Sequence, residues 1–346
     1  MLSYRLSYYL RVAAIAFVFL VLFRKILKGH DDAPVRNETI GEYDFLQVFE
    51  DDDELLKYSN VYFIESSGPF RPVVTIEPRY ACAIEAAARA NPRKNIIVLL
   101  ATWMDFTEAD HLQIPDLRTL LSFRNVHFRW LDLERFALGT QVDAVIKSKL
   151  LYDRPDGVAF LSEILRMVLL FKFGGIYLDL DVVTLKPLEF YHPNFFGART
   201  QDSADTSVMG LQRGDIGRSF AYDYLTFTKD LLEINPNCTG TTLLTNKLLA
   251  FCEKVTVQEI VDRGCFGQLE VFSPNLFHPF DETNVSEMFD ASKLHLVKDK
   301  IADSMAVHMH HHHSRGLKID PNGETGYEMI AKTYCPSVYQ DHGGDL

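Results

Sequence analysis

The chain has 346 residues, of which 47% are hydrophobic and 12% are aromatic. This composition excludes an intrinsically disordered protein and suffices for one large domain or two moderate ones with a sizeable core. The formal net charge of −12 argues against a uniformly basic surface of the kind that binds nucleic acid. We therefore expect no nucleic-acid partner.

An apolar segment near the amino terminus predicts a membrane anchor. Residues 12–23, VAAIAFVFLVLF, are wholly apolar, and Arg and Lys flank them on both sides. A cleaved signal peptide is the rival interpretation, but no small-residue cleavage site follows the segment. We expect residues 1–11 to form a cytoplasmic tail and residues 12–28 to form an uncleaved transmembrane signal anchor.

Features after this segment favour a lumenal position for the rest of the chain. Three glycosylation sequons follow, at Asn37, Asn237 and Asn284. The five cysteines are Cys82, Cys238, Cys252, Cys265 and Cys335. None of them forms a CxxC pair, which argues against a zinc ribbon. Cys252 and Cys265 are near enough in sequence to close a small loop in an oxidising compartment, and the odd count leaves at least one thiol free or intermolecular.

The chain after the anchor divides into a short stem and one folded domain. Residues 29–57 are polar and acidic, as expected of a stem, and residues 58–346 read as a single lumenal domain. In chain order, the domain is predicted to contain a strand at 60–66, a helix at 79–92, strands at 95–102 and 126–133, a helix at 157–175 and a strand at 176–185. This alternation predicts an α/β fold, with a mostly parallel, Rossmann-like sheet flanked by helices.

Two aspartates interrupt the last of these strands, IYLDLDVVTL. Because strand side chains alternate with period two, Asp179 and Asp181 share a face, about 7 Å apart at Cα in an extended strand. An edge strand with solvated carboxylates is one interpretation, but the apolar helix and Gly174–Gly175 that precede the strand favour a central position. Ligands of such sheets bind beyond the carboxyl ends of the strands. Paired carboxylates there would attract a hard divalent cation.

The preceding helix adds two charged residues near the aspartates. Glu163 and Arg166 stand at positions i and i+3 of an otherwise apolar helix, so they share a face. They form either an internal ion pair or a pair of groups that hydrogen-bond a polyhydroxylated ligand.

At this point the residues resemble a known family. The segment AFLSEILRMVLLFKFGGIYLDLDVVTLKPL is similar to the donor-binding segment of the DxD glycosyltransferases of family 32. Their pattern is Ser-Asp, an Arg three positions after that Asp, and then Phe-Gly-Gly-x-Tyr-x-Asp-x-Asp. Shorter stretches resemble the α-1,4-galactosyltransferase branch of that family, namely VYFIESSG, CAIEAAARANP, LLTNKLLAFC, CFGQLEVFSPNLFHPF and YCPS. The resemblance covers roughly residues 58–337.

The resemblance implies a GT-A fold, a Golgi location as a single-pass type II membrane protein, and retaining transfer from a UDP-sugar with Mn²⁺. The donor would be UDP-galactose or UDP-N-acetylgalactosamine, and the acceptor a glycosphingolipid or another glycan. Carried over by position, Asp179 and Asp181 would be the catalytic pair and would hold the metal together with His308. The donor-binding residues would be Phe63, Glu65, Glu163, Arg166 and Tyr177, with Tyr62 and Ile64 in the same strand as Phe63.

The chain also departs from the family pattern. Ser-Asp becomes Ser162-Glu163, and Val-His-x-Trp-Asn becomes Val-His-Met-His-His at residues 307–311. The branch's amide-Gly-Pro before Leu-Leu-Thr is replaced by Thr-Gly-Thr-Thr at residues 239–242. A second hypothesis is therefore a non-catalytic relative that binds a nucleotide sugar or glycan, or assists a partner transferase. The histidine run at 310–313 adds an open question, because it would suit a metal site, a pH-sensitive surface or a solvated loop. A hydrolase of the GxSxG type is excluded, because that motif is absent.

Overall fold

The computed structural model describes residues 46–346, apart from 103–111, 235–239, 267, 320–322 and 345. The strands are β1 (Gln47–Val48), β2 (Asn60–Glu65), β3 (Val74–Thr75), β4 (Asn95–Thr102), β5 (Leu112–Gln113), β6 (Val126–Asp132), β7 (Gly175–Leu178), β8 (Val182–Thr184), β9 (Phe195–Ala198), β10 (Ala204–Leu211), β11 (Glu270–Phe272) and β12 (Ala306–His308). The longer helices are α2 (Pro78–Ala90), α7 (Gly157–Phe173), α8 (Asp215–Ile234), α9 (Gly240–Cys252), α10 (Val257–Arg263), α12 (Leu294–Ile301) and α14 (Gly326–Tyr334). The shorter ones are α3 (Leu117–Leu121), α4 (Leu133–Ala137), α5 (Asp143–Lys147), α6 (Lys149–Tyr152), α11 (Pro274–Phe277), α13 (His311–Ser314) and α15 (Pro336–Asp341).

A mostly parallel sheet forms the centre of the molecule, as predicted. Its strand order is β1-β6-β4-β2-β7-β10-β9-β11. Strands β1, β6, β4, β2 and β7 run parallel to one another, whereas β10 is antiparallel to both β7 and β9. Strand β7 lies between β2 and β10, so the strand that leads into the aspartates is central rather than an edge strand.

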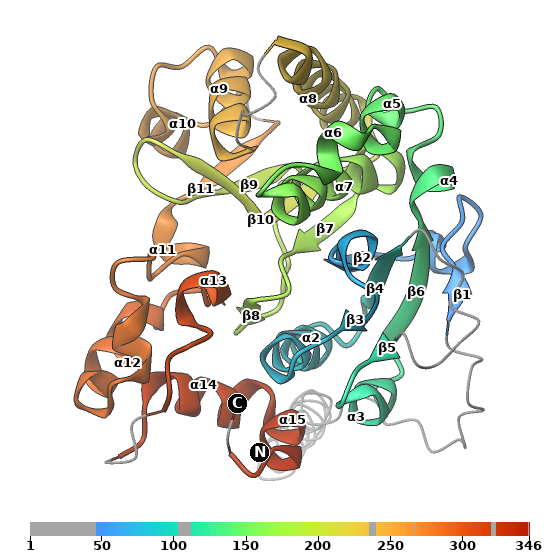
Figure 1. Ribbon diagram of the computed structural model, residues 1–346. Helices are drawn as coiled ribbons and strands as arrows, with labels where there is room; N and C mark the ends of the chain where they lie inside the picture. Colours follow the sequence, from blue (N-terminus) through green and yellow to red (C-terminus); the bar gives the residue numbers. More distant parts are fainter. Residues whose placement is uncertain (1–45, 103–111, 235–239, 267, 320–322, 345) are drawn as a thin grey trace, which may run out of the picture.

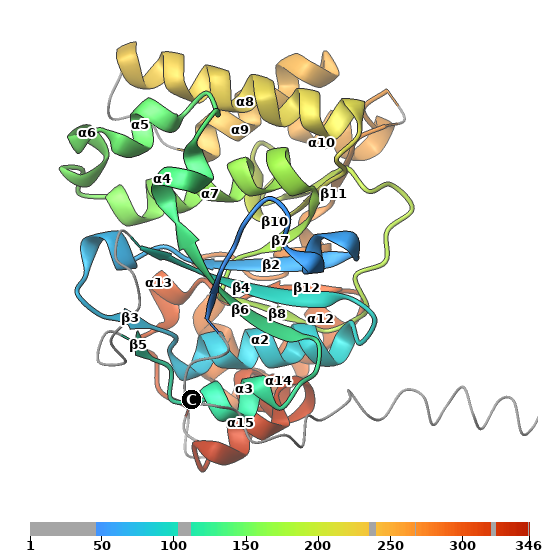
Figure 2. The same ribbon diagram turned by 90° about the vertical axis from the view of Figure 1, so that its right-hand side faces the viewer.

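Alternation along the central strands divides the core into two layers. In β2, Val61 and Phe63 pack with α2, whereas Tyr62 and Ile64 pack with α7 on the opposite face. A strand that is apolar on both faces is covered by helices on both sides. Figures 1 and 2 show this arrangement: α7, α8 and α9 cover one face, and α2, α14 and α15 cover the other.

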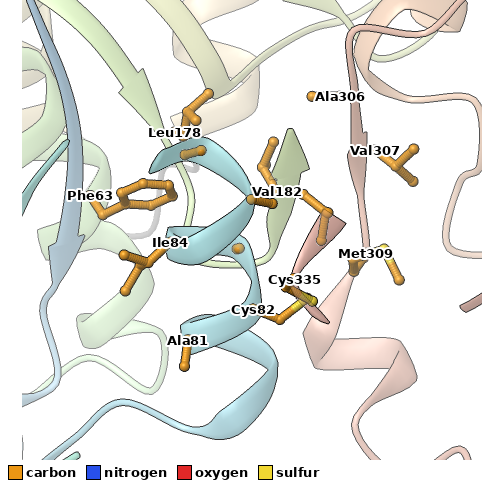
Figure 3. Close-up of a cluster of buried hydrophobic side chains, with 14 of the residues drawn as sticks. Phe63, Ala81, Cys82, Ile84, Leu178, Val182, Ala306, Val307, Met309 and Cys335 are labelled. Atoms are coloured by element: carbon orange, nitrogen blue, oxygen red, sulfur yellow. A yellow bond between two sulfur atoms is a disulfide. The ribbon is translucent and has the colours of Figure 1, made fainter. Parts of the chain in front are cut away.

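The carboxyl-terminal part of the chain returns to the middle of the fold through a second, small sheet. Strand β12 pairs antiparallel with β8, with His308 opposite Val182. A disulfide between Cys82 of α2 and Cys335 fastens this part of the chain to the helix layer. Figure 3 shows α2 packed between Phe63 and Leu178 on one side and Val307 and Met309 on the other. The predicted small loop is also confirmed, because Cys252 and Cys265 form a second disulfide.

The predicted strand at 176–185 is wrong as a single element. It is divided into β7 and β8, which belong to different sheets. The break lies at residues 179–181, where the Val182 N–H donates to the Asp179 carbonyl at 3.0 Å. The other predicted elements are found as β2, α2, β4, β6 and α7, with ends that move by at most two residues.

The amino-terminal predictions fall largely outside the described residues. These predictions are the tail (1–11), the anchor (12–28), the first part of the stem and Asn37. Within the part of the chain that the structure describes, no helix is long and apolar enough to cross a membrane. The end of the predicted stem joins the folded domain: Val48 pairs with Trp130 of β6, and Phe49 is buried in the core.

Helix α7 ends at a glycine that no other residue replaces easily. Gly174 has φ +64°, and its N–H donates to the Leu170 carbonyl. A Cβ atom there would lie 2.8 Å from the Arg213 backbone nitrogen and 3.0 Å from the Leu211 carbonyl oxygen. Gly139 also has a positive φ of +76°, but a Cβ there would meet nothing within 4 Å.

We predict that Gly174→Ala lowers the free energy of unfolding by more than Gly139→Ala does. A positive φ costs an alanine about 1–3 kcal/mol at either position, and only the alanine at 174 also collides with backbone atoms. Denaturant unfolding of the two variants measures the difference. Equal losses would contradict the close approach of β10 to this turn.

Candidate active site at the break between β7 and β8

The two aspartates lie where the chain leaves the large sheet and enters the small one. The Asp179 N–H donates to the Ser207 carbonyl of β10 at 2.8 Å, and this bond continues the pairing between β7 and β10. Two residues later, the Asp181 carbonyl accepts the Met309 N–H at 2.8 Å, just beyond β12. The turn between them places the carboxylates at the carboxyl end of a central strand, the position predicted for a ligand site.

Arg166 compensates the charge of Asp179. Its guanidinium contacts both carboxylate oxygens, with Nη2 2.8 Å from Oδ1 and Nη1 3.1 Å from Oδ2. The Tyr177 hydroxyl also donates to Oδ1 at 2.7 Å. Burial disfavours the charge of Arg166, but the acidic groups around it, Asp179 foremost, together outweigh this effect, so the pKa of Arg166 lies above its usual value. A two-pronged, charge-assisted pair of this kind fixes the orientation of the carboxylate.

Asp181 is compensated from the opposite side, by the carboxyl-terminal segment. Its Oδ1 lies 3.1 Å from His308 Nε2, and its Oδ2 accepts the His311 N–H at 2.7 Å. Burial alone would raise the pKa of Asp181, but the charge of His308 and these hydrogen bonds hold it below its usual value. Burial would lower the pKa of His308, whereas Asp181 raises it to about 9.

The three predicted metal ligands come together. Asp179, Asp181 and His308 each offer one ligand atom, and these atoms all lie within 4.8 Å of one another. Two carboxylate oxygens and an imidazole nitrogen form a donor set that fits a divalent ion such as Mn²⁺. The residues present therefore fit the metal that the sequence resemblance implies.

Glu163 and Arg166 share a face of α7, as predicted, and they meet at one hydroxyl of β10. The Thr206 Oγ1 donates to Glu163 Oε2 at 3.2 Å and accepts from Arg166 Nη1 at 3.1 Å. Arg166 also donates to the Ser162 hydroxyl at 2.7 Å. Burial raises the pKa of Glu163 to about 7, and Arg166 opposes this shift only in part.

The residues proposed from β2 divide between the site side and the core. Glu65, at the carboxyl end of the strand, accepts the Ser67 N–H through Oε1 at 3.0 Å. Its Oε2 is buried and has no hydrogen-bond partner among the described residues, and burial raises its pKa. The Phe63 side chain is fully buried against α2, and that of Tyr62 packs in the opposite core layer. Of Tyr62, Phe63 and Glu65, only Glu65 has a buried side-chain oxygen without a hydrogen-bond partner among the described residues.

Two residues that the sequence reasoning missed lie beside the aspartates. Asp205 of β10 accepts the Ser207 N–H at 2.6 Å. Burial would raise the pKa of Asp205, but His278, His308 and the hydrogen bonds from Ser207 together hold it below its usual value. His278, just after α11, has its ring centroid 5.3 Å from that of His308. A carboxylate within the wholly buried strand ADTSVMGL is the same signal that singled out Asp179 and Asp181.

The histidine run does not form one surface. His310 is buried and its Nε2 donates to the Phe280 carbonyl at 2.9 Å, whereas His311 is paired with Glu77 at 3.1 Å. His312 and His313 are exposed. His310 and His311 stand where the family has Trp and Asn. The hydrogen bond from residue 311 to Asp181 comes from the backbone, so the loss of the Asn side chain leaves it intact.

Two other predicted features lie away from this site or outside the described residues. Asn284 is half-buried in a turn, where its Oδ1 accepts the Asp281 N–H at 2.8 Å. Asn237 and Cys238 are outside the described part of the chain. A separate cavity, lined by Asn60, Gly175 and Arg213 among others, opens at the amino ends of β2 and β7, the opposite end from the aspartates.

The fold and the site together define a class of protein. A mostly parallel sheet with a carboxylate pair and a histidine at its carboxyl edge is the arrangement expected of a DxD glycosyltransferase. Two family models match the chain: "Glycosyltransferase sugar-binding region containing DXD motif" over residues 77–201, and "Alpha 1,4-glycosyltransferase conserved region" over residues 226–342. The resemblance seen in the sequence is thereby confirmed, and the chain carries both conserved regions.

Curated relatives carry names of the same kind. Lactosylceramide 4-alpha-galactosyltransferase of Mus musculus is 24% identical over 286 residues, covering 81% of this chain and 75% of the relative. Alpha-1,4-N-acetylglucosaminyltransferase of Homo sapiens is 22% identical over 291 residues, covering 81% and 80%. Among solved structures, the PaToxG glycosyltransferase matches with a TM-score of 0.40 and 16% identity, over 62% of this chain and 77% of that one.

We predict that Arg166→Gln destabilises the protein by about 3–5 kcal/mol, because it leaves Asp179 buried without its counter-charge. Adding Asp179→Asn should recover part of the loss. Arg93→Gln is the control, because its partner Glu189 is exposed and such pairs contribute about 0–1 kcal/mol. Urea unfolding gives all three values, and a double variant no more stable than Arg166→Gln would argue against the pairing.

Glu163 should make stability depend on pH. Its pKa is about 7 in the folded protein, above the ordinary value of 4.5 for a glutamate, so the unfolded chain loses the proton first. Stability that is present below about pH 4.5 is therefore lost as the pH rises through 7. We predict that wild type loses stability relative to Glu163→Gln across this range, in EDTA. A difference that does not change with pH would mean that Glu163 stays ionised.

Proposed function

We propose that this chain is a retaining, metal-dependent α-1,4-glycosyltransferase that moves a sugar from a UDP-sugar to a glycosphingolipid or another glycan. The observation that carries the proposal is the cluster of Asp179, Asp181 and His308 at the carboxyl end of β7. It lies in a chain that matches both conserved regions of such enzymes. A GT-A type of fold agrees with the mostly parallel sheet and with the position of the aspartates.

Asp179, Asp181 and His308 would hold Mn²⁺. The bound ion would supply positive charge that stabilises the departing diphosphate. Arg166 and Tyr177 keep the Asp179 carboxylate in one orientation, and the His311 N–H does the same for Asp181. Such positioning matters because catalysis depends on groups that are already in place when charge develops.

In a retaining transfer, the acceptor would attack the oxocarbenium-like sugar on the face that the diphosphate leaves. The departing phosphate oxygen can then take the acceptor's proton, so no strong protein base is required. Glu163, Glu65, Arg166 and Tyr177 remain the candidates for donor binding. Glu163 could hydrogen-bond sugar hydroxyls, because its side chain is half-buried. It is also linked to Arg166 by the Thr206 hydroxyl, which hydrogen-bonds both residues.

The names of the relatives indicate which sugar donors to test. One relative is named for galactose transfer to lactosylceramide and another for N-acetylglucosamine transfer. We therefore place UDP-galactose, UDP-N-acetylgalactosamine and UDP-N-acetylglucosamine among the donors to test. A Golgi location with the enzyme in the lumen would suit these acceptors. The apolar segment at residues 12–23 supports membrane anchoring, and the two disulfides suit an oxidising compartment.

We predict that the full-length protein in detergent, given Mn²⁺ and a UDP-sugar, releases UDP in the presence of a suitable acceptor. Asp181→Ala should lower the rate by about a hundredfold or more, as expected when a group that stabilises developing charge is removed. Asp303→Ala is the matched control, because Asp303 is exposed in the loop just before β12. Chelation by EDTA should stop the reaction, and added Mn²⁺ should restore it.

The same assay separates the second hypothesis. A non-catalytic relative would bind UDP in a metal-dependent manner but release none from any donor and acceptor pair. Equal rates for Asp181→Ala and wild type would reject the assignment of the metal site.

A further inference from the structure

Three histidines from two parts of the chain gather beside Asp181. His278 follows α11, His308 ends β12, and His310 precedes α13. The ring centroid of His308 lies 4.2 Å from that of His310 and 5.3 Å from that of His278. One nitrogen atom from each ring lies within 4.8 Å of the other two. This spacing would let the three rings reach a common ion.

The hydrogen bonding of these rings is incomplete. The Nδ1 atoms of His278 and His308 are buried and have no partner within the described residues. His310 has Nε2 2.9 Å from the Phe280 carbonyl, and because a carbonyl only accepts, this nitrogen carries the proton. The Nδ1 lone pair of a neutral His310 is then available as a ligand. Buried polar atoms without partners are costly, and coordination would relieve that cost.

The geometry points to a second metal site, formed by His278, His308 and His310, that takes a borderline ion such as Zn²⁺. Three imidazoles with an open fourth position are a common zinc arrangement. This set contains no carboxylate, whereas Mn²⁺ and Mg²⁺ prefer oxygen ligands. The nitrogen-rich site and the site with Asp179 and Asp181 would therefore select different ions, although they lie side by side.

His308 belongs to both sites. Its Nε2 faces Asp181 at 3.1 Å, which leaves Nδ1 for the nitrogen-rich site. A neutral imidazole has a proton on one ring nitrogen and a lone pair on the other, so His308 can ligate only one ion at a time, and two divalent ions this close would also repel each other. Zn²⁺ in the nitrogen-rich site should therefore weaken the binding of Mn²⁺ at Asp179 and Asp181. The nitrogen-rich site would then act as an inhibitory metal site. This inference needs no transfer activity and stands apart from the proposed function.

The exposed histidines are the main competitor for added metal. His312 and His313 lie on the surface and would bind transition metals adventitiously. They also provide the matched control, because they lie within three residues of His310 and have the same side chain. The variants to compare are His278→Gln, His310→Gln and the double variant His312→Gln/His313→Gln.

The first experiment titrates the full-length protein, made without a histidine tag, with Co²⁺ as the probe for Zn²⁺. We expect visible absorption that saturates at one equivalent and is reversed by Zn²⁺. Affinity should fall at least tenfold in both His278→Gln and His310→Gln and stay unchanged in His312→Gln/His313→Gln. The opposite pattern, with loss only in the double variant, would overturn the proposal. Circular dichroism without metal checks each fold, and either single variant alone suffices for the test.

The second experiment measures Mn²⁺ affinity by electron paramagnetic resonance, with and without one equivalent of Zn²⁺. We expect Zn²⁺ to weaken Mn²⁺ binding to wild type, and to weaken it less in His310→Gln, which keeps Asp179, Asp181 and His308. An equal effect in both proteins would place Zn²⁺ at the aspartates and reject the separate site.

Discussion

The structure depends on how two carboxylates, two residues apart, stay charged in the middle of the fold. Burying one such ion costs several kcal/mol unless it is paired. Asp179 is paired with Arg166 from α7, and Asp181 with His308 and the His311 N–H from the returning carboxyl-terminal segment. The two counter-charges therefore come from different layers, and both meet at the break between β7 and β8.

This arrangement explains why the chain changes sheets at that point. A continuous strand would leave both carboxylates on one face, competing for the same partners. The turn at residues 179–181 instead sends β8 toward β12, so each aspartate receives its own partner. The disulfide between Cys82 and Cys335 and the packing of α2 hold this part of the chain against the helix layer. The side chains and N–H group that compensate the aspartates therefore also connect the large sheet to the small sheet of β8 and β12.

Compensation also prepares the site for a metal. Carboxylates that are already held in one orientation by hydrogen bonds need little rearrangement to bind a cation. The departures from the family pattern fall mostly outside this set. His311 replaces an Asn, but its contribution to Asp181 is a backbone N–H. His310 replaces a Trp and joins His278 and His308 instead. The residues proposed to bind Mn²⁺ are therefore all present, and His310 supplies the third imidazole of the proposed nitrogen-rich site.

Local patterns in the sequence determined β2, α2, β4, β6 and α7 and their order, because helices and strands follow the spacing of their apolar residues. They also predicted the sheet type, the shared face of Glu163 and Arg166, and the two aspartates as candidate ligands, whereas His308 was proposed from the family resemblance. The break at residues 179–181 was not predictable, because apolar residues flank it evenly on both sides. Asp205 and His278, and the pairing of Cys82 with Cys335 across 253 residues, depend on contacts between distant segments. Only the tertiary structure could decide these contacts. Hydrophobic periodicity and secondary-structure propensity describe neighbours along the chain, whereas charge compensation and disulfide pairing depend on neighbours in space.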